Sequence, residues 1–171
     1  SLVRRVAVTK LPTTHGNEFT AILYANDIDR QSHIALVKGE IKPEDEVMVR
    51  VHSECLTGDV FHSLRCDCRQ QLEMALEMIA ERGAGVLVYE QQEGRGIGLT
   101  EKLKAYILQN EGLDTVDANL ELGHSVDSRD WTEAIAILKN LNLQEVTLLT
   151  NNPEKVRAVR ESGIACQPRA L

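Results

Sequence analysis

The hydrophobic pattern of the chain changes near Cys68, and this change limits the possible folds more than any other feature. Before it, the apolar residues form short extended runs at residues 5–8, 19–24, 35–37 and 47–51. The links between these runs are too short for helical crossovers. The first part of the chain is therefore predicted to form neighbouring strands of a largely antiparallel sheet.

After Cys68, helical and extended patterns alternate. Three helices are predicted from apolar stripes at helical spacing: Leu72, Ala75, Leu76 and Ile79; Leu99, Leu103, Tyr106 and Ile107; and Trp131, Ala134, Ile135, Leu138 and Leu141. A fourth helix is expected to start with Asn152 as its N-cap and Pro153 in its first turn, and to end near Gly163. Strands are expected at residues 85–89 and 146–149. This alternation predicts βα units.

Together the two patterns predict an α/β fold: a mixed sheet with helices on its faces, antiparallel in its N-terminal part and built of βα units in its C-terminal part. With no linker, repeat or low-complexity tract, residues 1–171 are expected to form one domain. The stripes predict buried helix faces, so Trp131 and Tyr106 are most simply core residues. The Tyr106 hydroxyl could still point into a cleft.

The charge balance narrows the classes of partner. The formal net charge is −7 at neutral pH, which argues against binding to nucleic-acid backbones or anionic membranes. A small anionic ligand is still compatible, because a local arginine cluster can outweigh a distant acidic surface. The sequence has no apolar run of membrane-spanning length and no signal-like start, so a cytoplasmic location is expected.

Four cysteines in a cytoplasmic protein are expected to be reduced thiols. Cys55, Cys66 and Cys68 form a Cys-x10-Cys-x-Cys arrangement. Three thiolates can hold Zn²⁺ and leave its fourth position for water, as in catalytic sites. The alternative is that they are three small buried hydrophobic residues, as Cys166 is expected to be.

The residues before Cys55 suggest a competing interpretation. His52-Ser53-Glu54 fits the H-x-E half of the zinc deaminase signature, which continues with P-C-x-x-C. Cys66 and Cys68 are separated by a single residue and no proline precedes them. The second half of that signature is therefore absent.

Basic residues near predicted helix starts are candidates for phosphate binding. Arg95 lies in a glycine-rich loop between a strand and a helix, where backbone N–H groups favour phosphate, although a simple tight turn explains the glycines equally well. Lys155 and Arg157 lie in the first turns of the last helix, and Arg129 precedes the third. Arg95, Lys155 and Arg157 could instead be solvated surface charges, and Arg129 could be a salt-bridge partner.

Taken together, five motifs resemble the GTP cyclohydrolase II family, in order along the chain: Arg50-Val51-His52-Ser53-Glu54-Cys55-Leu56-Thr57-Gly58-Asp59, Ser63-Leu64-Arg65-Cys66-Asp67-Cys68, Gln92-Glu93-Gly94-Arg95-Gly96-Ile97-Gly98-Leu99, Asp114-Thr115-Val116-Asp117-Ala118-Asn119 and Leu149-Thr150-Asn151-Asn152-Pro153. The family opens riboflavin biosynthesis. With water, Zn²⁺ and Mg²⁺ it converts GTP into 2,5-diamino-6-ribosylamino-4(3H)-pyrimidinone 5′-phosphate, formate and diphosphate. Some members are fused to 3,4-dihydroxy-2-butanone 4-phosphate synthase.

The resemblance implies a role for each matching residue. It makes Cys55, Cys66 and Cys68 ligands of one Zn²⁺ per subunit, with water as the fourth ligand, and places Mg²⁺ on the triphosphate. It makes Asp127 a proton acceptor, places Arg129 at the α-phosphate and Tyr106 at the ring-opening step. The implied nucleotide contacts are Arg50, Val51, His52, Ser53, Glu54, Gln71, Glu93, Gly94, Arg95, Thr115, Thr150 and Lys155. The family also implies a homodimer.

Other functions compatible with these residues are kept as alternatives. A paralogue could retain the metal site and stop at a formamide product or act on another heterocycle. A non-catalytic nucleotide sensor could use the same fold. A zinc module that binds nucleic acid fits least, because of the negative charge and an aromatic content of only 4%.

Overall fold

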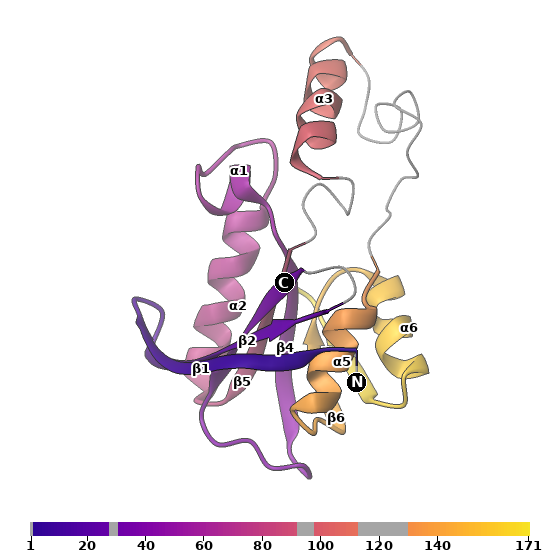
Figure 1. Cartoon of the computed structure of the whole chain (residues 1–171). Helices are drawn as coiled ribbons and strands as arrows, with labels where there is room; N and C mark the ends of the chain where they lie inside the picture. The colour runs from indigo at the N-terminus through magenta and orange to yellow at the C-terminus, as the bar shows by residue number, and fades with distance from the viewer. Residues whose placement is uncertain (1, 28–30, 92–97, 113–129) are drawn as a thin grey trace.

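A single mixed sheet organises the protein (Figure 1). The computed structural model describes residues 2–27, 31–91, 98–112 and 130–171. Within these ranges seven strands have the order β1-β2-β3-β5-β4-β6-β7. The strands are β1 (Arg4–Thr13), β2 (Asn17–Ala25), β3 (Ser32–Lys38), β4 (Glu46–Ser53), β5 (Gly85–Glu90), β6 (Glu145–Leu149) and β7 (Ala165–Arg169). The helices are α1 (Leu56–Asp59), α2 (Cys68–Arg82), α3 (Leu99–Asn110), α5 (Thr132–Asn140) and α6 (Pro153–Glu161).

The predicted fold class is confirmed. Strands β1, β2, β3 and β5 pair antiparallel, whereas β5, β4, β6 and β7 pair parallel. The expectation that the four N-terminal strands are neighbours in a largely antiparallel sheet is wrong for β4, because β5 lies between β3 and β4. The connection through α2 returns the chain as β5 alongside β4, so β4 joins the parallel half of the sheet.

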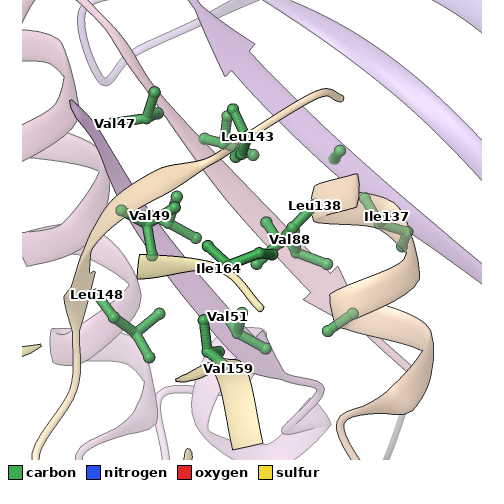
Figure 2. Packing of buried hydrophobic residues seen from close by; sticks show 14 of the residues in the cluster. Val47, Val49, Val51, Val88, Ile137, Leu138, Leu143, Leu148, Val159 and Ile164 are labelled. Atoms are coloured by element: carbon green, nitrogen blue, oxygen red, sulfur yellow. The ribbon is translucent and has the colours of Figure 1, made fainter. Parts of the chain in front are cut away.

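Helices cover both faces of the sheet. On one face α5 and α6 pack on the central strands, and Figure 2 shows Val49, Val51 and Val88 meeting Leu138 and Val159 there. On the other face α2 packs through Ala75, Leu76 and Ile79 against a smaller cluster. The predicted stripes of α2 and α5 therefore face the core, with their central residues buried and Leu72, Trp131, Ile135 and Leu141 partly buried. Cys166 in β7 is buried as well.

The ends of α2 and α6 follow from local sequence. Gly83 ends α2 in the left-handed conformation, at φ 80°, and its N–H donates to the carbonyls of Ile79 and Ala80. Asn152 caps α6, with its side-chain oxygen accepting from the N–H of Glu154, and Pro153 occupies the first turn. These caps agree with the prediction for α6.

Helix α3 departs from the prediction. Its apolar stripe was expected to be buried, yet Leu103 is 44% and Ile107 57% exposed. Of its residues only Ala105 is buried. Periodicity predicts the helix but not the surface that covers it. None of the helices in the described ranges is long and apolar enough to cross a membrane.

Candidate metal and nucleotide site

The carboxyl ends of the parallel strands mark the candidate site. Ser53 ends β4, Glu90 ends β5, and Thr150 follows β6 directly. After β4 the chain crosses one face of the sheet through α2 and returns as β5 on one side of β4. Strand β6 lies on the other side of β4 and is preceded by α5, which packs on the opposite face. In open α/β sheets, ligands bind at the carboxyl edge where the strand order reverses in this way.

Three thiols converge at this edge. Cys55 follows β4, Cys66 lies between α1 and α2, and Cys68 begins α2. Their sulfur atoms all lie within 4.8 Å of one another, and those of Cys55 and Cys66 are 3.6 Å apart. Tetrahedral zinc with Zn–S bonds of about 2.3 Å separates its sulfur ligands by about 3.8 Å. The cluster could therefore hold a metal ion, and its spacing fits zinc.

Gly58 permits this close approach. It lies in α1, the single turn between Cys55 and Cys66. A Cβ atom added there would lie 2.7 Å from the Cys66 sulfur and 3.2 Å from the Cys55 sulfur. Any other residue would push the thiols apart, so the three cysteines depend on this glycine as well as on their own spacing.

Two polar side chains contact the sulfur of Cys55. The Lys102 ammonium donates to its sulfur at 3.0 Å, and the Thr57 hydroxyl lies 3.7 Å from it. Burial alone would raise the pKa of the Cys55 thiol, but these hydrogen bonds, foremost that from Lys102, lower it below its usual value. Burial and the two neighbouring thiols raise the pKa of Cys68 instead. The site thus favours the thiolate at Cys55 over that at Cys68.

Asp59 fixes the backbone of Cys55 to the sheet. Its buried carboxylate accepts from the Cys55 N–H at 3.1 Å, from the Tyr89 hydroxyl at 2.7 Å and from Nε2 of His52 at 3.1 Å. Burial opposes the charge of Asp59, yet the hydrogen bonds from His52 and Tyr89 hold its pKa below the usual value. Burial and the same carboxylate raise the pKa of Tyr89.

His52 serves this network rather than an open pocket. Its ring is 2% exposed and stacks on Tyr89 with centroids 5.6 Å apart. Its Nδ1, like the hydroxyl oxygen of Ser53, is buried without a hydrogen-bond partner among the described residues. Both atoms therefore retain hydrogen-bonding capacity at the carboxyl edge.

Tyr106 of α3 lies beside the thiols. Its hydroxyl is 3.4 Å from the Thr57 hydroxyl. The Arg65 guanidinium lies 4.7 Å and the Lys102 ammonium 5.9 Å from the centre of its ring. The tyrosine is thus half-buried next to the cluster, with its hydroxyl directed to a residue that contacts Cys55.

Buried cations hold the strand ends together. Arg50 donates to the Leu149 carbonyl at 2.9 Å and to the Gln71 side-chain oxygen at 3.1 Å. Lys155 donates to the Val51 carbonyl at 3.0 Å. Arg50 is 7% and Lys155 4% exposed. These bonds join β4 to β6, α2 and α6 and concentrate positive charge below the carboxyl edge.

The structure thus brings together many of the residues singled out from the sequence. Those that gather at the carboxyl edge are Arg50, Val51, His52, Ser53, Glu54, Cys55, Cys66, Cys68, Gln71, Tyr106, Thr150 and Lys155. Val51 differs from the others, because its side chain is in the hydrophobic core and only its backbone faces the edge residues. Six lie outside the described residues: Glu93, Gly94, Arg95, Thr115, Asp127 and Arg129.

Sequence reasoning missed four residues that shape the site: Gly58, Asp59, Tyr89 and Lys102. Lys102 had a usable signal, because it precedes Tyr106 by four positions and so shares its helix face. Gly58 and Asp59 were named only as members of the first family motif, without a role. No local pattern indicates the roles of Gly58 and Tyr89, since these depend on contacts made across the fold.

Comparison with known proteins gives a consistent family. The model of the GTP cyclohydrolase II family matches residues 4–170. The riboflavin biosynthesis protein RibBA of Bacillus mycoides is 56% identical over 160 residues, which cover 94% of this chain and 40% of that protein. RibBA of Chlorobium phaeovibrioides is 51% identical over 163 residues, covering 95% and 40%. The chain therefore spans about 40% of the length of these relatives.

A solved structure also resembles the chain at low similarity. It is that of RibBX, a two domain 3,4-dihydroxy-2-butanone 4-phosphate synthase from A. baumannii, with 22% sequence identity and a TM-score of 0.46. The match covers 89% of this chain and 35% of that one. A likeness this distant adds nothing to the assignment of the site.

Proposed function

This chain belongs to the GTP cyclohydrolase II family, and on that premise we propose that it hydrolyses GTP in a zinc-dependent reaction, the first step of riboflavin biosynthesis. The products are the ribosylaminopyrimidinone phosphate, formate and diphosphate. The observation that carries the proposal is the three-thiol cluster at the carboxyl edge of the sheet. Buried basic residues beside it suit a charged nucleotide.

The thiol cluster is the proposed zinc site. Cys55, Cys66 and Cys68 would hold the ion, and Gly58 leaves room for their sulfurs to meet. When bound by three protein ligands, zinc lowers the pKa of its water to about 7 and so supplies a nucleophile at neutral pH. That chemistry suits attack on C8 of the guanine imidazole ring, the carbon released as formate.

Ring opening requires proton transfer by nearby side chains. Tyr106 is proposed to donate or steer a proton through its hydroxyl, which lies beside Thr57 at 3.4 Å. Glu54 adjoins Cys55 and is proposed as a second proton carrier. His52 is proposed to support these groups rather than to carry the proton, because its Nε2 is hydrogen-bonded to Asp59 and its ring stacks on Tyr89.

Diphosphate release requires charge stabilisation at the other end of the substrate. The proposed nucleotide contacts among the described residues are Arg50, Val51, His52, Ser53, Glu54, Gln71, Thr150 and Lys155. Glu93, Gly94, Arg95 and Thr115 are proposed to complete them. Mg²⁺ would offset the triphosphate charge. Arg129 is proposed to stabilise the reacting α-phosphate and Asp127 to accept a proton there, and the active form is proposed to be a homodimer.

The test is to incubate the zinc-loaded protein with GTP and Mg²⁺ and to quantify formate, diphosphate and the pyrimidine product in one reaction. The proposal predicts equal amounts of all three. A formamide product without formate would indicate a paralogue that stops early. Tight GTP binding without turnover would overturn the enzymatic assignment in favour of a nucleotide sensor.

A further inference from the structure

Helix α3 carries Tyr106 yet is weakly embedded in the described part of the fold. Figure 1 shows α3 at the top of the view, above α1 and away from the sheet that α2, α5 and α6 cover. Leu103 and Ile107 on its apolar stripe are exposed. Core packing of the kind that positions α6 therefore does not explain how α3 holds Tyr106 at the site.

Helix α3 instead makes polar contacts with the segment that carries the first two thiols. Lys102 donates to the Cys55 sulfur at 3.0 Å, and the Tyr106 hydroxyl lies 3.4 Å from that of Thr57. The Arg65 guanidinium hydrogen-bonds Gln109 and Asn110 and covers the Tyr106 ring. Among these contacts, only that of Lys102 reaches a proposed metal ligand directly.

The Lys102 contact joins α3 directly to the proposed metal site, because its ammonium group lies 3.0 Å from the sulfur of Cys55. Three thiolates around a divalent ion carry a net charge of −1, and an ammonium group 3.0 Å from one sulfur offsets it. Groups that hydrogen-bond a metal ligand tune both the ligand and the affinity for the ion. Because a bound metal would also fix the Cys55 sulfur in one position, the Lys102 contact should hold α3 more firmly in the metal-loaded protein than in the metal-free one.

We propose that Lys102 is a positioning residue that couples metal binding at Cys55, Cys66 and Cys68 to the docking of α3, and so brings Tyr106 to the site when the metal is present. The inference rests on the proposed function only in that the thiols bind a metal. Coupling between two equilibria is reciprocal. Metal binding should stabilise the docked helix, and loss of the Lys102 contact should weaken metal binding.

The experiment measures both sides of this coupling without substrate. Zinc affinity is measured by chelator competition, and hydrogen exchange of residues 99–110 is followed with and without zinc. Three variants are compared with the wild-type protein: Lys102→Met, which removes the charge; Lys102→Arg, which keeps it; and Lys104→Met. Lys104 is the matched control, because it lies on the same helix but is exposed and pairs with Glu101 at 3.2 Å.

In the wild-type protein, zinc should slow exchange in α3. In Lys102→Met, zinc should bind about tenfold more weakly and should no longer slow that exchange. Lys102→Arg should recover part of both effects, and Lys104→Met should match the wild type. The proposal is overturned if Lys102→Met binds zinc as tightly as the wild type, or if zinc leaves α3 exchange unchanged in the wild type. Neither measurement depends on GTP turnover, so a failure of this proposal can be distinguished from a failure of the proposed reaction.

Discussion

Helices α6 and α3 each bring a proposed functional residue to the same edge, but different forces hold them. In α6, Val156 and Val159 are buried in the main core, and Lys155 bonds the Val51 carbonyl beneath them. In α3, Ile107 is exposed and polar contacts to the thiol segment hold the helix. The proposed phosphate side of the site is thus built into the core, whereas Tyr106 lies on a helix that contacts the thiol segment through polar groups.

The largest effect on the free energy of unfolding is expected from a change at Asp59, the buried carboxylate beneath the thiols. Asp59→Asn replaces a carboxylate that accepts from Cys55, His52 and Tyr89 with an amide that carries donors of its own. Hydrogen bonds to charged groups contribute about 1.5–3 kcal/mol each, so we expect the free energy of unfolding to fall by about 3 kcal/mol. Urea unfolding measures it. Asp27→Asn, at an exposed ion pair with Arg4, is the control and should change little. Equal effects would remove Asp59 as the anchor of the cluster.

The next largest difference is expected between one apolar truncation in α6 and one in α3. Val159 is 1% exposed, and Val159→Ala should lower the free energy of unfolding by about 2 kcal/mol through lost burial and a residual cavity. Ile107 on α3 is 57% exposed, and Ile107→Ala should change it by less than about 0.5 kcal/mol. Thermal and urea unfolding report both values. A large loss in Ile107→Ala would mean that α3 is held by apolar packing, contrary to the comparison.

The close approach of the thiols to α1 can be broken without touching a cysteine. Gly58→Ala places a methyl group against the sulfurs of Cys66 and Cys55. We expect zinc affinity to fall by about tenfold, as for other changes that displace metal ligands indirectly. Gly83→Ala is the control, because its Cβ meets nothing within 4 Å. It should lower stability through its left-handed backbone and leave zinc affinity unchanged. Chelator competition that finds no difference between the two variants would refute the role of Gly58.

The smallest effect concerns the cap that α6 has and α3 lacks. The Asn152 side chain accepts from the Glu154 N–H at 2.9 Å, whereas Gly98 before α3 has no side chain to do so. Asn152→Ala should cost about 1 kcal/mol of stability. Asn151→Ala, at the exposed neighbouring position, should cost less than about 0.5 kcal/mol. If urea unfolding gives the same midpoint for both, the cap does not contribute to holding Lys155 in place.

The sequence predicted the parts of the fold that have strong local patterns. The stripes of α2 and α5 and the cap of α6 each identified an element correctly. Two short elements were missed: α1 is a single turn, and β7 contains Pro168 and is largely exposed. Local patterns also cannot specify pairing between distant segments, which is why the insertion of β5 beside β4 was not predicted.

The candidate site was likewise predicted only in the part that has a local sequence pattern. The cysteine spacing was sufficient to suggest a metal cluster, because Cys66 and Cys68 are close in sequence and Cys55 follows a strand end. The support for that cluster comes from Asp59, Tyr89 and Lys102, which lie on α1, β5 and α3. Their contacts exist only once the sheet has formed and α3 has docked. For α3, the stripe predicted burial because a periodic pattern contains no information on whether another element covers it.

The most direct test of the account is to measure formate and diphosphate in the same reaction for the wild-type protein and for Cys66→Ser, with GTP and Mg²⁺. Cys66 belongs to the thiol cluster, whereas Arg50 bonds Leu149 and Gln71, and Lys155 bonds Val51. The account predicts that the variant loses formate release while it still releases diphosphate. Formate production at the wild-type rate by Cys66→Ser would contradict the central claim that the three thiols hold the metal that opens the ring.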